Sequence, residues 1–270
     1  MNIREKIMKL QKLDPYSKAS ILLMVVAAAL VALALVTNLG EFVTAAFVIS
    51  GALCALTGIF VLTFTRGESS DSRVIGIIFA QECINFCRML SGLGITGNAF
   101  FLPPRITGEP RVRQFNPTRS YSGSQVSAKE SFPKTGPAGL VSIPSCELLI
   151  QELKTRNALV IPDKEEDLSM LIDETIGEVF DFASRVSASW HDNKVTITFH
   201  GHRFIGGCKT IAQESRDYCA MAPCPVCSLC GTLLAEGTDR VVALDQCSIN
   251  SSSHDVTAIF SILPLPDGNQ

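Results

Sequence analysis

The sequence predicts a transmembrane hairpin of two helices near the N-terminus, followed by a cytoplasmic α+β domain with an antiparallel sheet. Two uncharged stretches predict the hairpin: 22 residues separate Lys18 from Glu41, and 24 separate Glu41 from Arg66. A helix needs about 20 apolar residues to cross the hydrocarbon core of a bilayer, so each stretch is long enough. Beyond residue 139, short alternating segments are interspersed with helical patterns, which is typical of an α+β domain.

The uncharged stretches fit three alternative structures less well. Buried helices of a soluble protein rarely stay uncharged over this length. A cleaved signal peptide would need a shorter apolar run, and here a second full-length run follows at once. A single re-entrant segment would place the Glu41 carboxylate near the bilayer centre, where it is costly. Within the hairpin, the small residues Gly51 and Ala55, and likewise Ala28 and Ala32, are four apart and favour close helix contact.

Charges predict the orientation of the hairpin. Basic residues outnumber acidic ones before the first span, Arg66 and Arg73 follow the second, and the tip carries only Glu41. Because lysine and arginine concentrate on the cytoplasmic side, we expect a cell-membrane protein with both termini in the cytoplasm. The net charge is +6 over residues 1–139 and −9 over residues 140–270. The basic part suits anionic membrane lipid, whereas the acidic part argues against a nucleic-acid partner.

Composition and periodicity divide the chain into six segments. They are a cytoplasmic amphipathic segment (1–18), the transmembrane hairpin (19–66), a membrane-proximal helix (67–100), a linker rich in Pro, Gly and Arg (101–138), the cytoplasmic α+β domain (139–264) and a tail (265–270). The membrane-proximal helix has helical periodicity but too many polar side chains for a third span. No periodicity persists in the linker, and we expect residues 120–136 to be disordered.

The α+β domain contains recognisable helices and strands. Ser145 is a candidate N-cap for a helix from Cys146 to Arg156, and Asp163 with Glu166 matches a capping box for a second helix ending near Arg185. The remaining expected elements are strands at 158–161, 186–190, 195–199 and 240–247, an extended piece through 204–205, a helix at 226–236 and a last strand at 255–263.

A cluster of cysteines carries the strongest chemical signal. Cys224, Cys227 and Cys230 form a C-x-x-C-x-x-C motif, and Cys219 precedes it by five residues. Short cysteine spacings allow several thiolates to reach one metal ion, so these four residues are the predicted metal ligands. Cys208, Cys247 and His202 are weaker candidates. Zinc is the first expected cofactor and an iron–sulfur cluster the second.

A reactive thiol and simple packing are two alternative roles for these cysteines, and both remain open. A cysteine at the start of a helix can be a reactive thiolate, and cysteines are also among the most frequently buried residues. A zinc ribbon would need a second separated C-x-x-C pair, which the chain lacks. Ten cysteines in a cytoplasmic protein favour thiols, metal ligands or packing over disulfides. No catalytic constellation is recognisable, and Gly206-Gly207 indicates a turn, so an enzyme is not favoured.

Two stretches and the hairpin resemble uncharacterised two-helix membrane proteins of methanogenic archaea. The stretches are Leu102-Pro103-Pro104-Arg105-Ile106-Thr107-Gly108 and residues 223–237. That family implies no activity. Residues 186–263 resemble the 4-vinyl-reductase ligand-binding domain, a small α+β sensor module. Cys227 or Cys230 with Gly231, then Asp245 and Cys247, stand in the order of its motif. The last cysteine of that family has no counterpart here, and His254 is the nearest residue, which puts one zinc ligand in doubt.

These observations support three hypotheses of function. The first is a membrane-anchored cytoplasmic binding or sensor domain, with a small ligand or a metal at the cysteine cluster. The second is a structural or scaffolding membrane protein whose cysteines only pack in the core and whose partners are proteins. The third is an iron–sulfur electron carrier, which ranks last because no substrate site is visible.

Overall fold

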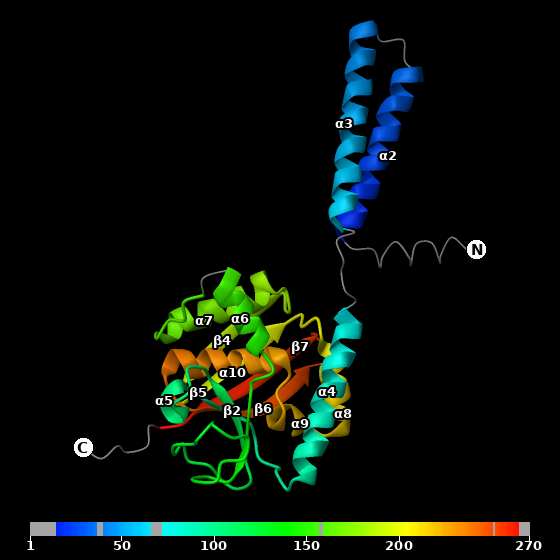
Figure 1. The fold of residues 1–270 in the computed structure, drawn as a ribbon. Helices are drawn as coiled ribbons and strands as arrows, with labels where there is room; N and C mark the ends of the chain where they lie inside the picture. The colour runs from blue at the N-terminus through cyan, green and yellow to red at the C-terminus, as the bar shows by residue number, and fades with distance from the viewer. Residues whose placement is uncertain (1–14, 37–39, 66–71, 157–158, 251, 265–270) are drawn as a thin grey trace. The chain divides into compact units, whose positions relative to one another are not determined.

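The computed structural model describes residues 15–36, 40–65, 72–156, 159–250 and 252–264 (Figure 1). The chain divides into two compact units, Met1–Ser70 and Asp71–Gln270. The predicted amphipathic segment before residue 15 and the tail after residue 264 lie outside the described residues. In the second unit, one sheet and the helices packed on it position every cysteine of the predicted cluster.

The first unit is an antiparallel pair of apolar helices, α2 (Pro15–Val36) and α3 (Glu41–Thr65). Ser20, Ala27 and Ala34 are buried at seven-residue intervals, which is the repeat of a helix–helix seam. The Ser20 hydroxyl donates a hydrogen bond to the Gly58 carbonyl at 2.7 Å. Gly51 is at the seam as predicted, but Ala28 and Ala32 are exposed, so that half of the packing prediction is wrong. The four-residue spacing identified small residues but not the face that carries the contact.

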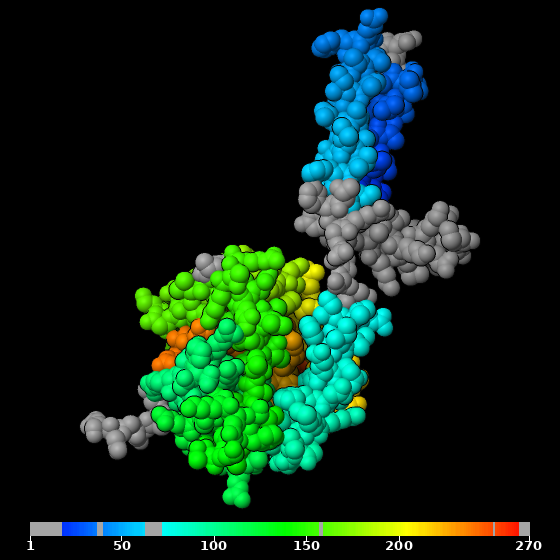
Figure 2. Space-filling view, in the orientation of Figure 1, coloured from blue at the N-terminus to red at the C-terminus, as the bar shows by residue number. Residues whose placement is uncertain are grey.

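Three helices among the described residues, rather than two, are long and apolar enough to cross a membrane. The third is α4 (Ser72–Gly92), whose polar side chains predicted that it would not span. In the structure α4 packs against α8 (Ile205–Glu214) and forms one outer side of the second unit (Figure 2). An added Cβ at Gly207 would lie 2.3 Å from the Gly76 carbonyl oxygen. Gly207 therefore lies at a close contact between α8 and α4. Both Gly206 and Gly207 are in α8, so the predicted turn and extended piece are wrong.

The second unit is built on a seven-stranded antiparallel sheet with the order β3-β2-β1-β6-β7-β5-β4. The strands are β1 (Phe100–Leu102), β2 (Arg113–Pro117), β3 (Gly139–Ser142), β4 (Arg185–His191), β5 (Lys194–His200), β6 (Val242–Asn250) and β7 (Asp255–Ile262). Inward residues of β5 and β7 alternate with partly exposed ones, so only one face of this part of the sheet is fully covered. The predicted antiparallel α+β architecture is confirmed.

The segment predicted as a linker is part of this sheet. β1 pairs with β6, and β2 lies between β1 and β3. Residues 101–138 therefore contribute most of β1, which lies inside the sheet, and all of β2, which lies next to the edge strand β3. Phe101 and Phe115 are fully buried, and Val126 is buried within the stretch predicted to be disordered. The prediction of an extended linker is therefore wrong: these strands are too short for an alternating pattern to stand out among the Pro and Gly residues.

The covered face of the sheet packs on α10 (Pro225–Thr238), whose residues Val226 to Ala235 are all buried (Figure 1). An ideal Cβ at Gly231 would lie 2.2 Å from the Phe101 ring, so this glycine permits the contact between α10 and β1. The other helices are α5 (Pro104–Thr107), α6 (Glu147–Arg156), α7 (Glu165–Asp173), a π-helix (Glu174–Val179) and α9 (Tyr218–Met221). A helix over the predicted 146–156 region and the 186–199 hairpin are confirmed.

The second predicted helix differs at both ends. Lys164 rather than Asp163 is the N-cap of α7, without a side-chain hydrogen bond, so the predicted capping box is absent there. The helical segment continues only to Val179 through the π-helix, and Asp181 then adopts a left-handed conformation with φ 53°. Described residues of the predicted 158–161 strand are not in a strand.

Candidate metal site

Three cysteines from separate elements meet beneath the covered face of the sheet. Cys219 lies in α9, Cys227 in the first turn of α10 and Cys247 in β6. Their sulfur atoms all lie within 4.8 Å of one another. Cys219 Sγ is 3.0 Å from Cys247 Sγ, and Cys227 Sγ is 3.7 Å from Cys247 Sγ. We call this group, together with Cys224, the thiol cluster.

A β-bulge in β6 places Cys247 in the cluster. The pairing with β7 slips between Leu244 and Gln246, so Asp245 is the extra residue. Leu244 pairs with Phe260 on the buried face, and after the bulge Cys247 pairs with Ala258 on that same face. A regular strand would have turned Cys247 to the opposite face, because side chains alternate with a period of two. The bulge therefore aims its thiol at α10.

Cys224 brings a fourth thiol to the group. It is the N-cap of α10, with Pro225 in the first turn, and its thiol interacts with those of Cys219 and Cys227. The backbone N–H of Cys224 donates to the Cys219 sulfur, and that of Cys227 donates to the Cys224 sulfur. Hydrogen bonds from backbone N–H groups stabilise thiolates, which are the form of cysteine that binds metals.

The four thiols of the cluster differ in their pKa values. Hydrogen bonds with the thiols of Cys224, Cys227 and Cys247 hold the pKa of Cys219 well below its usual range. The hydrogen bond with Cys219 raises the pKa of Cys224 to about 12, and the corresponding hydrogen bonds raise the pKa values of Cys227 and Cys247 well above the usual value. In the absence of a cation, Cys219 is therefore the most acidic of the four thiols.

The spacing of the sulfurs fits a single cation. In a tetrahedral zinc site with Zn–S bonds of about 2.3 Å, neighbouring sulfurs lie about 3.8 Å apart. The separation of 3.7 Å between Cys227 and Cys247 already matches this value. Cys219 and Cys247 would have to move apart by less than about 1 Å to reach the same geometry. A multinuclear iron–sulfur cluster would need a wider space between the sulfurs.

The other predicted ligands lie elsewhere. Cys230 is fully buried and, like Cys224, lies outside the group of three sulfurs within mutual reach. The Cys224 thiol hydrogen-bonds with those of Cys219 and Cys227, whereas Cys230 interacts with Cys224 and Cys146 through their charges. His202 is buried against Phe199 and Phe204, and desolvation lowers its pKa to about 4. Cys208 lies in α8 and lines a cavity beside the cluster. Cys247, a weaker candidate by sequence, is thus better placed than Cys230.

The cavity opens onto two cluster sulfurs. It has a volume of about 540 Å³ and lies between α8, α9 and the outer edge of β6. Cys208, Cys219 and Cys247 line it together with Arg216, Asp217 and Asp245. Cys219 and Cys247 are partly exposed, whereas Cys224 and Cys227 are buried. A solute can therefore approach the cluster from this side.

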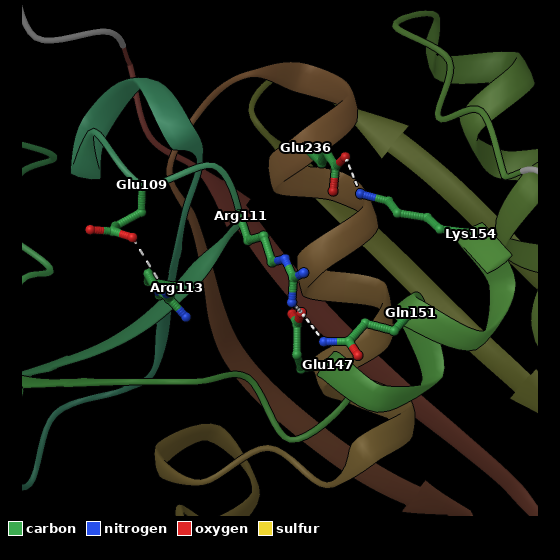
Figure 3. Close-up of polar contacts among 7 residues, drawn as sticks. All are labelled: Glu109, Arg111, Arg113, Glu147, Gln151, Lys154 and Glu236. Atoms are coloured by element: carbon green, nitrogen blue, oxygen red, sulfur yellow. Dashed lines mark hydrogen bonds and ion pairs between the residues drawn. The ribbon is translucent and has the colours of Figure 1, made fainter.

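A polar cleft between the β2 region, α6 and α10 is a second candidate site (Figure 3). Its charges are already paired: Arg111 donates to Glu147 at 2.7 Å, and Lys154 lies 2.8 Å from Glu236. The same Glu147 oxygen accepts a hydrogen bond from Gln151 at 2.9 Å. Such ion pairs are common at protein surfaces and contribute little energy, so this cleft does not indicate a ligand.

Sequence reasoning missed the connection between α4 and the segment that carries the cluster. Cys83 donates to the Ala222 carbonyl at 2.8 Å, and Cys87 donates to the Tyr218 carbonyl at 3.3 Å. These carbonyls flank Cys219. Cys83 and Cys87 are four residues apart and share the buried face of α4, but their spacing does not reveal which segment this face contacts.

Fold and cluster together define a class of protein with apolar N-terminal helices joined to an α+β domain that gathers four thiols. A family model described as "Domain of unknown function (DUF7982)" matches residues 2–260, and the chain belongs to this family. No curated protein and no solved structure matches the chain.

Proposed function

We propose that the protein is a membrane-anchored cytoplasmic binding or sensor domain that holds one zinc ion through Cys219, Cys224, Cys227 and Cys247. The observation that carries the proposal is the approach of three sulfurs, from α9, α10 and β6, to within 4.8 Å of one another. A set of four thiolates suits zinc, and iron is the main competitor for such ligands.

Two further observations support zinc over mere packing. Backbone N–H groups donate to the sulfurs of Cys219 and Cys224, which favours thiolates that packing alone does not need. All ten cysteines are free, and a reducing compartment keeps thiols available as ligands. On this proposal zinc joins α9, α10 and β6, and its binding adds to the stability of the domain.

The membrane part of the proposal comprises two spans, α2 and α3, with both termini in the cytoplasm. Lysine and arginine at the flanks of the hairpin support this orientation. The buried face of α4, which includes Cys87 and Leu90, supports its assignment to the domain rather than to a third span. Anionic lipid is the proposed partner of the basic flanks, and nucleic acid is not a proposed partner.

The test is the metal content of the full chain, purified in detergent under reducing conditions. Wild type should hold close to one zinc per chain, and Cys219→Ser should lose most of it. Cys54→Ser, in α3, is the matched control and should keep the wild-type zinc content. A folded wild type without metal would refute the proposal and favour a structural protein with packing cysteines. Iron with sulfide would instead support the electron-carrier hypothesis.

A further inference from the structure

We propose that the cavity between α8, α9 and β6 is the entry route for the cation, and that Cys208 is a transient ligand on this route. The inference rests on the proposed zinc site and adds a fifth thiol to it. Cys208 lies in the second unit but outside the four-thiol cluster, so its role concerns the path of the metal and not the final coordination.

The placement of Cys208 beside the cluster supports this route. Its side chain lines the same cavity as Cys219 and Cys247, the two partly exposed thiols of the cluster. Burial is the main cause of the raised pKa of Cys208, and electrostatic interactions with Cys224 and Cys219 add to it. Cys208 is therefore close enough to interact electrostatically with the cluster. A cation inside the cavity meets three sulfurs, of which only two belong to the final site.

The coordination chemistry of zinc suits Cys208 to a transient role. Four other thiols complete the tetrahedral set, so Cys208 has no place in the final coordination, and burial raises its pKa. A cation that arrives beside it favours loss of the proton, because metals bind thiolates and release protons. The Zn–S bond forms as the S–H proton leaves to solvent. Transfer to the cluster then breaks that bond, and Cys208 regains a proton. No electron is exchanged in either step.

A competing route exists on the other side of the cluster. A cavity of about 270 Å³ beneath α4 is lined by Cys83 and Cys224. Cys224 is buried, however, and the Cys83 thiol already donates to the Ala222 carbonyl at 2.8 Å. This route offers one buried cluster thiol, whereas the route past Cys208 offers two partly exposed ones. Cys83 therefore provides a matched control for Cys208.

The experiment measures how fast Co²⁺ enters the metal-free full chain in detergent, followed by the thiolate-to-cobalt absorption in a stopped-flow instrument. Cys208→Ser should load at least about fivefold more slowly, because it lacks the thiolate that first receives the cation. Its final cobalt content and equilibrium affinity should stay within about twofold of wild type, since the four ligands remain. Cys83→Ser should load at the wild-type rate.

A second variant tests the route without changing a thiol. Ser248 is exposed and lines the same cavity, so Ser248→Arg adds bulk and positive charge to it and should also slow loading. Equal rates for Cys208→Ser and wild type would overturn the inference while leaving the zinc site intact. Loss of cobalt stoichiometry in Cys208→Ser would overturn it too, because Cys208 would then be a permanent ligand. A wild type that binds no cobalt would refute the proposed site itself, and the inference with it.

Discussion

Replacing Cys247 and Cys230 separately by serine distinguishes a metal site from a packed core. The two residues offer a matched pair, since both are cysteines of the second unit and the sequence motif favoured Cys230. In the structure Cys247 Sγ lies 3.0 and 3.7 Å from two cluster sulfurs, whereas Cys230 lies in the hydrophobic core. The zinc proposal therefore predicts opposite outcomes for two chemically identical substitutions.

The expected magnitudes follow from the number of ligands. Structural zinc sites bind with about 10–16 kcal/mol, so one of four thiolates accounts for about 3 kcal/mol and Cys247→Ser should weaken zinc binding about 10²-fold. Cys230→Ser leaves all four ligands in place. It buries a hydroxyl in an apolar site, which should lower the free energy of unfolding by about 1–3 kcal/mol.

Two assays are needed. Competition with a chromophoric chelator measures zinc affinity, and urea unfolding of the metal-free chain measures stability. Cys247→Ser should change mainly the first quantity and Cys230→Ser mainly the second. Equal zinc affinity for Cys247→Ser and wild type would refute the four-thiol site. A large loss of zinc in Cys230→Ser, without unfolding, would restore the ligand set that the sequence motif predicted.

Four further predictions follow from particular contacts. Zinc binding at pH 7 should release protons, because zinc binds thiolates and the pKa values of Cys224, Cys227 and Cys247 lie above the usual value; calorimetry in buffers of different ionisation enthalpy measures this release. His202 has a folded pKa of about 4, below its unfolded value of 6.5, so the free energy of unfolding should fall by about 3 kcal/mol as the pH drops from 6.5 to 4. His202→Phe should remove most of that dependence in urea titrations at several pH values, and an unchanged dependence would assign it to other groups. Gly231→Ala should cost about 1–3 kcal/mol by clashing with the Phe101 ring, with partial recovery on adding Phe101→Leu, and additive effects of the two changes in urea unfolding would contradict the clash. Gly51→Leu should separate α2 from α3, because an added Cβ already lies 3.0 Å from the Val31 side chain, and thermal unfolding of the hairpin in detergent should reveal the loss; an unchanged unfolding temperature would contradict the seam.

Local sequence patterns predicted the two apolar helices and much of the sheet. Uncharged length identified α2 and α3, and alternation with a turn at Asp192-Asn193 identified β4 and β5. Both signals are local, so one stretch of sequence suffices. The three-residue strand β1 carries no such signal, because its position depends on pairing with β6, far away in the sequence. A fragment beginning at residue 139 would lack β1 and β2 and is a poor choice for biochemistry.

The cluster was predicted in part, and its gaps have physical causes. Cys219, Cys224 and Cys227 are close in sequence, so their spacing alone suggested a common site. Cys230 follows the same motif, yet Cys224 rather than Cys230 hydrogen-bonds with the sulfurs that lie within mutual reach. Cys247 is placed by the bulge at Asp245, which depends on pairing with β7 and leaves no motif in the sequence. The cysteine spacing therefore predicted the segment that carries the site, whereas strand pairing in the fold decides which cysteines come within reach of one another.

The central claim is that four thiols hold one zinc ion, and a direct test is X-ray absorption at the zinc edge of the full chain purified in detergent. The account predicts close to one zinc per chain with four sulfur neighbours at about 2.3 Å. Zinc surrounded by nitrogen or oxygen ligands would contradict the cluster as the site. A folded chain with no metal would contradict metal binding altogether and leave these cysteines as core residues.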